Sequence, residues 1–215
     1  MHIYGLIIGI SIALGLSYFQ KHNHLIPKKS EKFFIIGLII TNILGARIYH
    51  VLDHWIFYSQ NILEIFQTWH GGLGIFGAII FALIYIFIFS RLIHISYLPI
   101  LNSITPILPL TQAIGRLGNW VNQENPFWWQ ESLLDLLLFL IIHRFPKNPT
   151  AKYLFGYGAI RLATDTFRQD IWIINQFKIS QLFGIIFILL GLCIYFYETR
   201  IQISKTNFSK RSLGP

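Results

Sequence analysis

The chain has 215 residues, of which 54% are hydrophobic and only 12% are charged. Soluble domains carry about 25% charged residues, so this composition excludes an ordinary soluble domain and indicates a polytopic membrane protein. The net charge of +8 suits either nucleic-acid binding or the cytoplasmic loops of a membrane protein. Cys193 is the single cysteine, which excludes an internal disulfide and a cysteine-based metal site.

Seven apolar segments approach the length of about 20 residues that a membrane-spanning helix needs. They cover residues 3–19, 33–52, 72–89, 98–117, 127–142, 153–163 and 182–197. The fifth and sixth are short and contain polar residues. The sequence therefore predicts an all-α integral membrane protein with about seven transmembrane helices, in which residues 1–200 form one domain and residues 201–215 form a polar tail.

The basic residues are distributed unequally among the connecting loops. If the seven segments alternate in direction, twelve of the 17 lysines and arginines lie on one side of the membrane, and the opposite loops hold only Arg168 and Lys178. Because positive residues are retained on the cytoplasmic side, the N-terminus is predicted to lie outside and the C-terminus in the cytoplasm. Their dispersal over several loops also argues against a nucleic-acid-binding surface.

Three further arginines, Arg47, Arg116 and Arg161, lie in or at the end of apolar segments. In this topology all three fall toward the outer half of the membrane. A lone arginine near a helix end often has no functional role and only extends its charged group to the membrane–water interface. Three such residues on one side favour a shared functional site, because each costs at least ~2.5–3.5 kcal/mol to insert. A guanidinium binds phosphate through two parallel hydrogen bonds, which suggests a phosphate-bearing lipid head group as ligand.

Polar side chains follow Arg116 within the stretch GRLGNWVNQENP, residues 115–126. They are Asn119, Asn122, Gln123 and Glu124. A little further along, Glu131 and Asp135 are one helical turn apart and are suited to pair with the arginines.

A second stretch, YGAIRLATDTFR, has polar residues at helical spacing. They are Tyr157, Arg161, Asp165 and Arg168, which share one face if the helix persists. A structural salt bridge between Arg161 and Asp165 explains the spacing as well as a ligand site does. His70, beside Gly71 and Gly72, is the outer-side histidine with a pKa suited to a base, although an interfacial side chain is the commoner role.

These blocks resemble, in order, those of the bacterial prolipoprotein diacylglyceryl transferase family. GRLGNWVNQE resembles the signature G-R-x-G-N-x-x-N-x-E, and the other similar blocks are HIYGLII with Tyr4, GARIY with Arg47, WHGGLGIFGA, YGAIR with its downstream acid and arginine, and KISQL with Gln181. The resemblance covers almost the whole chain.

The resemblance implies transfer of the sn-1,2-diacylglyceryl group from phosphatidylglycerol to the lipobox cysteine thiol of a preprolipoprotein. A thioether forms and glycerol 1-phosphate leaves. The resemblance further implies a monomeric, multi-pass enzyme of the bacterial plasma (inner) membrane that needs no metal or other cofactor. Its expected partners are phosphatidylglycerol, lipobox signal peptides and membrane lipids, and not nucleic acid.

The residues expected at the site fall into two groups. The predicted catalytic residues are Arg116, Arg161, Glu124, Asp165 and His70. The predicted substrate-binding residues are Tyr4, Arg47, Gly71, Gly72, Asn119, Asn122, Glu131, Tyr157, Arg168 and Gln181. Arg116 and Arg161 suit stabilisation of the departing phosphate, because fixed cations favour the state in which negative charge builds up.

The chain also departs from the family pattern. Phe127 replaces the last glycine of the signature, and Pro126 and Glu131 follow Glu124 so closely that a segment outside the membrane is shortened. Asp165 stands where the family usually has glutamate, and Phe76 where many members have a histidine. Two other functions therefore stay open: a lipid-binding relative without activity, and a small lipid or anion transporter, which would favour inverted repeats that the sequence lacks.

Overall fold

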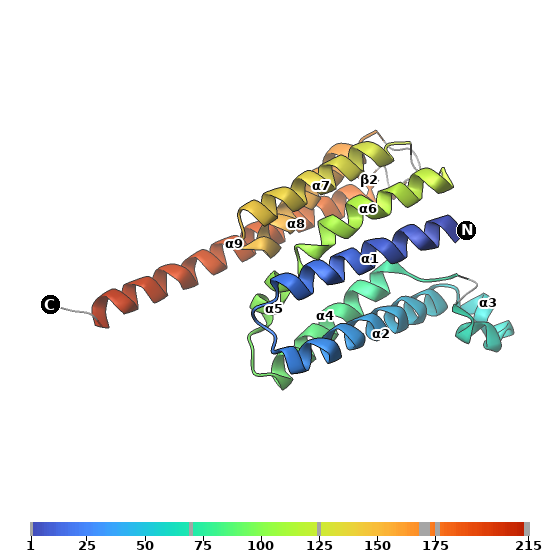
Figure 1. The fold of residues 1–215 in the computed structure, drawn as a ribbon. Helices are drawn as coiled ribbons and strands as arrows, with labels where there is room; N and C mark the ends of the chain where they lie inside the picture. Colours follow the sequence, from blue (N-terminus) through green and yellow to red (C-terminus); the bar gives the residue numbers. More distant parts are fainter. Residues whose placement is uncertain (1, 69–70, 124–125, 168–172, 175–176, 213–215) are drawn as a thin grey trace. The chain divides into compact units, whose positions relative to one another are not determined.

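The computed structural model describes residues 2–68, 71–123, 126–167, 173–174 and 177–212, nearly all of them helical. The elements in chain order are α1 (His2–His22), α2 (Lys28–Asp53), α3 (Trp55–Gln60), η1 (Ile62–Phe66), α4 (Ile75–Leu92), α5 (Tyr97–Ile104), α6 (Ile107–Asn122), α7 (Trp128–Arg144), α8 (Pro149–Thr164), β1 (Ile173–Ile174), β2 (Phe177–Lys178) and α9 (Ile179–Ser212) (Figure 1). The two strands pair antiparallel over two residues each. Apart from this short pairing, the predicted all-α class is confirmed.

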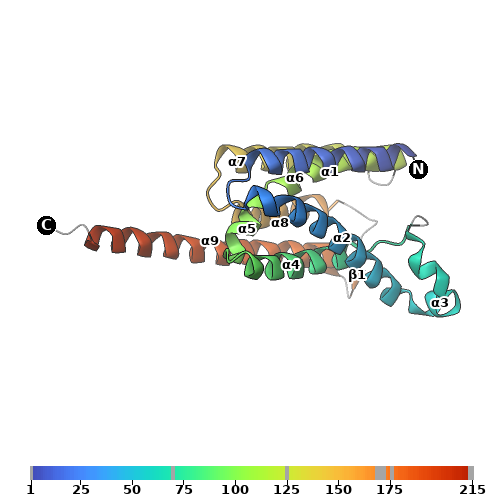
Figure 2. The ribbon, with the colours of Figure 1, turned by 60° about the horizontal axis from the view of Figure 1, so that its bottom comes forward.

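The helices form two compact units, one of Met1–His22 with Asn102–Pro215 and one of Asn23–Leu101. In the first unit α1 packs along α6, α6 along α7, α7 along α8, and α8 along α9. In the second unit α2 packs along α4, and the short α3 and η1 lie beyond the C-terminal end of α2 (Figure 2). The polar tail expected over residues 201–215 continues α9 as helix to Ser212. One catalytic domain over residues 1–200 stays a prediction.

Three helices within the described ranges are long and apolar enough to cross a membrane. They are Ile3–His22, Lys28–Asp53 and Ser180–Gln202, and the apolar stretch Phe76–Leu92 is shorter. Many large apolar side chains point outward from these helices, such as Phe33 at 75% exposure. Such a surface suits lipid as its surroundings, which agrees with the membrane protein expected from composition. The number of seven spans and their orientation stay predictions.

The fourth predicted span, residues 98–117, is not one helix. The chain breaks at Thr105–Pro106, between the end of α5 and the start of α6. Proline has no amide hydrogen, so Pro106 cannot continue the hydrogen-bond pattern of α5. Polar side chains surround the break: the hydroxyls of Thr105 and Thr150 are 2.9 Å apart, and the Thr150 amide donates to Asn102 Oδ1 at 3.2 Å.

Glycines allow two pairs of helices to approach closely. A Cβ atom added to Gly45 on α2 would lie 2.5 Å from the backbone oxygen of Gly77 on α4. A Cβ atom added to Gly158 on α8 would lie 2.5 Å from the backbone oxygen of Gly184 on α9. Small residues at the contact are typical of membrane helices, because they let two backbones come close together.

Candidate active site

Side chains from α6, α7 and the end of α8 meet in one ion-pair network inside the first unit. Arg116 Nη1 lies 2.8 Å from Glu131 Oε2, and Arg116 Nε lies 3.6 Å from Asp135 Oδ2. Arg161 Nη1 lies 3.9 Å from the same oxygen of Glu131 and 3.6 Å from Asp165 Oδ1. Glu131 therefore joins the two arginines into one cluster.

Helical spacing accounts for the placement of residues that share one helix. Glu131 and Asp135 are four residues apart on α7, so both carboxylates point from the same face. Arg161 and Asp165 have the same spacing at the end of α8, where the Asp165 amide donates to the Arg161 carbonyl at 3.0 Å. The predicted salt bridge between these two residues is confirmed. The remaining contacts depend on how α7 packs against α6 and α8.

Arg161 is also held from the side by a pair of tyrosines. The Tyr157 hydroxyl accepts hydrogen bonds from Arg161 Nε at 2.8 Å and Nη2 at 2.5 Å. The ring of Tyr153 stacks on that of Tyr157 with centroids 5.5 Å apart. The Tyr153 hydroxyl in turn accepts a hydrogen bond from Gln112 Nε2 at 2.9 Å. These contacts fix the direction of the Arg161 guanidinium, as expected for a residue placed to bind a ligand.

The acidic side chains of the network are more deeply buried than the two arginines. Glu131 is 1% exposed, and Asp135 and Asp165 are 0% exposed. The side chains of Arg116 and Arg161 are 15% and 19% exposed. A buried carboxylate is costly unless it is paired, and these acids are paired with the arginines. The arginines, and not the carboxylates, are thus the charged side chains that keep some exposure.

Lys178, the last residue of β2, brings a third positive charge to the network. Lys178 Nζ donates to the backbone oxygens of Asp165 at 2.7 Å and Thr166 at 2.9 Å. Gln181 Nε2 donates to Thr166 Oγ1 at 3.1 Å, which places this predicted substrate-binding residue beside Asp165. Lys178 is a basic residue near the site that does not belong to the predicted site residues.

Tyr4, on α1, contacts α6, the helix that contains Arg116 and most of the signature residues. A Cβ atom added to Gly118 would lie 2.8 Å from Cδ2 of the Tyr4 ring, so the ring packs directly on this glycine. Asn119 and Asn122 follow on the same helix, about one and two turns after Arg116. The structure therefore groups Tyr4 with the signature segment.

The remaining predicted site residues divide into two sets. Arg47, Gly71 and Gly72 belong to the second unit, where Arg47 Nη1 donates to the backbone oxygens of Gly71 at 2.7 Å and Gly72 at 3.0 Å. Three other predicted residues lie outside the described residues: His70, Glu124 and Arg168.

Asp135 is the acidic member of the network that the predicted site residues omit. The signal for it in the sequence is an acid one helical turn after Glu131, inside an otherwise apolar stretch. A charge buried in such a stretch needs a partner. The sequence thus indicates an arginine partner for Asp135, but the identity of that arginine follows only from how α7 packs on α6.

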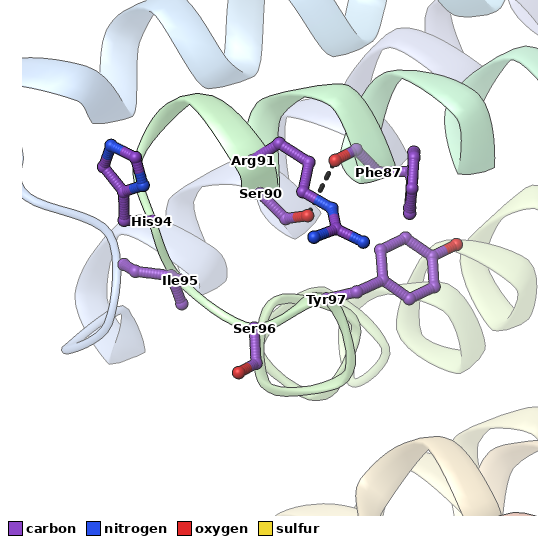
Figure 3. Close-up of a pocket in the computed structure, with 7 residues that line it drawn as sticks. All are labelled: Phe87, Ser90, Arg91, His94, Ile95, Ser96 and Tyr97. Carbon is purple, nitrogen blue, oxygen red and sulfur yellow. Dashed lines mark hydrogen bonds between the residues drawn. The ribbon is translucent and has the colours of Figure 1, made fainter.

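A cavity of about 430 Å³ lies elsewhere, at the junction of α4 and α5 in the second unit (Figure 3). Its lining residues are Phe87, Ser90, Arg91, His94, Ile95, Ser96 and Tyr97. The Arg91 guanidinium lies against the Phe87 ring, 5.0 Å from its centroid. The last carbonyls of α4 face an anion unfavourably, and no described member of the predicted site lines the cavity, so it is a poor phosphate site. Among the described residues, no group of three potential metal ligands is found.

Comparison with known proteins agrees with the motif analysis. A family model described as Prolipoprotein diacylglyceryl transferase matches residues 1–128 and 125–197. The phosphatidylglycerol–prolipoprotein diacylglyceryl transferase of Listeria monocytogenes serotype 4a (strain HCC23) is 29% identical over 256 aligned positions, which cover 98% of this chain and 90% of that protein. The protein of the same name from Fervidobacterium nodosum is 33% identical over 196 positions, which cover 74% of this chain and 67% of that protein.

The alignments also locate the shortened segment. The match to the family model divides at residues 125–128, the point at which the sequence analysis placed the missing residues. The Listeria alignment is longer, at 256 positions, than this chain of 215 residues. The relative therefore carries internal residues that this chain lacks.

Proposed function

Because the chain belongs to the prolipoprotein diacylglyceryl transferase family, we propose that it is a phosphatidylglycerol–prolipoprotein diacylglyceryl transferase. In this reaction a C–S bond forms between the lipobox cysteine and the sn-3 carbon of the diacylglyceryl group. The bond between that carbon and the phosphate oxygen breaks, and the electron pair leaves with glycerol 1-phosphate. The observation that best supports the proposal is the pairing of Arg116 and Arg161 through Glu131, with both arginine side chains partly exposed.

In the proposed mechanism these two guanidiniums receive the lipid phosphate on their exposed side. Glu131, which bridges the arginines at 2.8 and 3.9 Å, holds them together from the buried side. Tyr157 holds Arg161 in the same way. Cations that are oriented beforehand stabilise the negative charge that grows on the phosphate oxygen as the C–O bond breaks, and they need little rearrangement to do so.

The nucleophile comes from the substrate protein, and it reacts as a thiolate. Asp165 is fully buried and paired with Arg161, which suits a residue that positions the arginine better than one that accepts the thiol proton. Phe76 has no group that takes a proton. We propose that the positive field of the arginines increases the thiolate fraction of the lipobox cysteine, whose free thiol has a pKa of about 8.5.

We also propose that the protein works as a monomer in the bacterial plasma (inner) membrane, with seven spans, an outer N-terminus and a cytoplasmic tail. The support for this orientation is the excess of basic residues in alternate loops. It places the Arg116 end of α6 at the outer side of the membrane, where the lipobox cysteine of an exported substrate emerges.

The test is a transfer assay with purified protein in phosphatidylglycerol vesicles and a synthetic lipobox peptide. The expected result is a peptide that gains one diacylglyceryl group on its cysteine, with release of glycerol 1-phosphate. A peptide with serine in place of the lipobox cysteine is the matched control. Lipid binding without product would instead indicate a relative without transferase activity, and lipid flux without product would indicate a transporter.

A further inference from the structure

We propose that Arg47 is a positioning residue. It holds residues 61–68 and 71–74 of the loop before α4, which include Gly71 and Gly72, in one conformation. It affects transfer through that loop without contacting the lipid. The structural part of this inference is independent of the reaction, and only its effect on catalysis rests on the proposed function.

The guanidinium of Arg47 is directed at the backbone of this loop. Its acceptors are the carbonyl oxygens of Glu64, Ile65, Gln67, Gly71 and Gly72. Nη1 donates to Gly71 at 2.7 Å and to Gly72 at 3.0 Å, Nε donates to Ile65 at 2.9 Å, and Nη2 donates to Glu64 and, at 3.4 Å, to Gln67. A guanidinium has five N–H groups, so these five contacts occupy its whole donor capacity.

Burial makes this set of contacts hard to exchange. Arg47 is 6% exposed, and its guanidinium carbon lies 5.1 Å from the ring centroid of Tyr58, which is itself 5% exposed. A charge with so little access to water is stable because carbonyl dipoles replace its hydration. A lipid phosphate could bind Arg47 only if the loop gave up these carbonyls. This distinguishes Arg47 from Arg116 and Arg161, whose partners are carboxylates and whose side chains are more exposed.

The loop has the backbone shape that this contact needs. Gly71 and Gly72 have φ angles of 93° and 74°, a region that residues with a side chain rarely adopt. A Cβ atom added to Gly72 would lie 2.6 Å from Arg47 Nη1. The Gly74 amide donates to the Ala46 carbonyl at 2.9 Å, directly before α4 begins. The two glycines therefore allow the backbone to close around the guanidinium.

Amide hydrogen exchange without substrate tests the structural part. In Arg47→Lys the ammonium offers three donors on one nitrogen and cannot span carbonyls that lie on both sides of a guanidinium. The amides of Gly71 and Gly74 should then exchange about tenfold faster or more, because the loop opens locally, while those in α4 keep their rates. Arg91→Lys, an exposed arginine of the same unit, is the matched control and should change neither. Loop exchange in Arg47→Lys at the wild-type rate would overturn the proposal.

Added phosphatidylglycerol distinguishes positioning from phosphate binding in the wild-type protein. If Arg47 were a phosphate ligand, it would release loop carbonyls, and exchange at Gly71 and Gly74 would accelerate with lipid. Positioning predicts rates that stay constant or fall. Acceleration by vesicles of phosphatidylglycerol, and not by vesicles of phosphatidylcholine, would overturn the proposal.

Gly72→Ala gives a second route to the same result if Arg47→Lys does not fold. It adds a methyl group against Nη1 and leaves the charge in place, and it should accelerate loop exchange as Arg47→Lys does. In the transfer assay both variants should reduce kcat more than they raise the KM for phosphatidylglycerol. If no form of the protein transfers lipid, the proposed function fails, while the exchange rates still decide the role of Arg47.

Discussion

At the residue scale, the partners of each intramembrane arginine indicate its role. Arg116 and Arg161 face carboxylates, share Glu131, and are 15% and 19% exposed at the side chain. Arg47 faces backbone carbonyls and is 6% exposed. The first two can add an anionic ligand without losing their buried partners, whereas Arg47 cannot. One residue type thus serves two purposes in this protein.

The first prediction concerns the planar geometry of Arg116. In Arg116→Lys the charge remains, but two-pronged phosphate binding and the contact with Asp135 are lost. We expect kcat/KM for transfer to fall at least ~100-fold, as when a donor that stabilises a transition-state charge is removed. Arg144→Lys, an exposed arginine on α7, should retain activity. Near-normal transfer by Arg116→Lys in the vesicle assay would mean that Arg116 is structural.

The second prediction concerns Asp135, which is fully buried beside Arg116. Asp135→Ala removes one partner of a buried charge and should lower the free energy of unfolding by about 3 kcal/mol. Asp135→Asn keeps the shape and one acceptor oxygen, so its loss should be smaller. Thermal unfolding in detergent measures both, with the exposed Asp53→Ala as control. An unchanged melting temperature for Asp135→Ala would show that Arg116 needs only Glu131.

At the element scale, the second helical unit depends on the glycine contact between α2 and α4. Gly77 is buried, and a Cβ atom on it would meet the backbone oxygen of Gly45. Neither backbone can shift without moving a whole helix, in contrast to a contact with a flexible side chain. The closeness of these two helices is thus a property of the pair.

The third prediction tests this contact. Gly77→Ala should destabilise the protein by about 1–3 kcal/mol, the usual cost of excess volume at a tightly packed contact. Gly9→Ala on α1 adds the same methyl group where no atom lies within 4 Å, and it should be neutral. The difference between their melting temperatures is the measurement. Equal stability of the two variants would show that α2 and α4 can separate at no cost.

At the scale of the whole molecule, the fourth prediction concerns orientation in the membrane. Twelve of the 17 basic residues fall between predicted spans on the side assigned to the cytoplasm. A cysteine at Lys29, in the first turn of α2, should therefore be hidden from an impermeant thiol reagent in intact cells. A cysteine at Ser59 in α3 should be labelled. Both variants need Cys193→Ser to remove the single native thiol. Labelling at Lys29, with none at Ser59, would invert the topology.

Much of the fold follows from local rules. Lipid-facing helices are visible in composition because each needs a long apolar stretch. The pairing of Arg161 with Asp165 is visible because residues four apart share a helix face. The break at Thr105–Pro106 is not visible in composition, because residues 98–117 are apolar enough overall to suggest one helix. The local indication of the break is Pro106, which lacks the amide hydrogen that a continuous helix needs.

The sequence by itself determined the helical membrane class, the ordered motifs of the family and the residues of the signature, since all of these are properties of short segments. Only the tertiary structure decided that Glu131 lies between Arg116 and Arg161, because that contact joins three segments through helix packing. Only the tertiary structure decided, too, that Arg47 faces the backbone of its own unit's loop. An arginine in an apolar stretch needs hydrogen-bond or ion-pair partners, but the identity of those partners depends on how the helices pack.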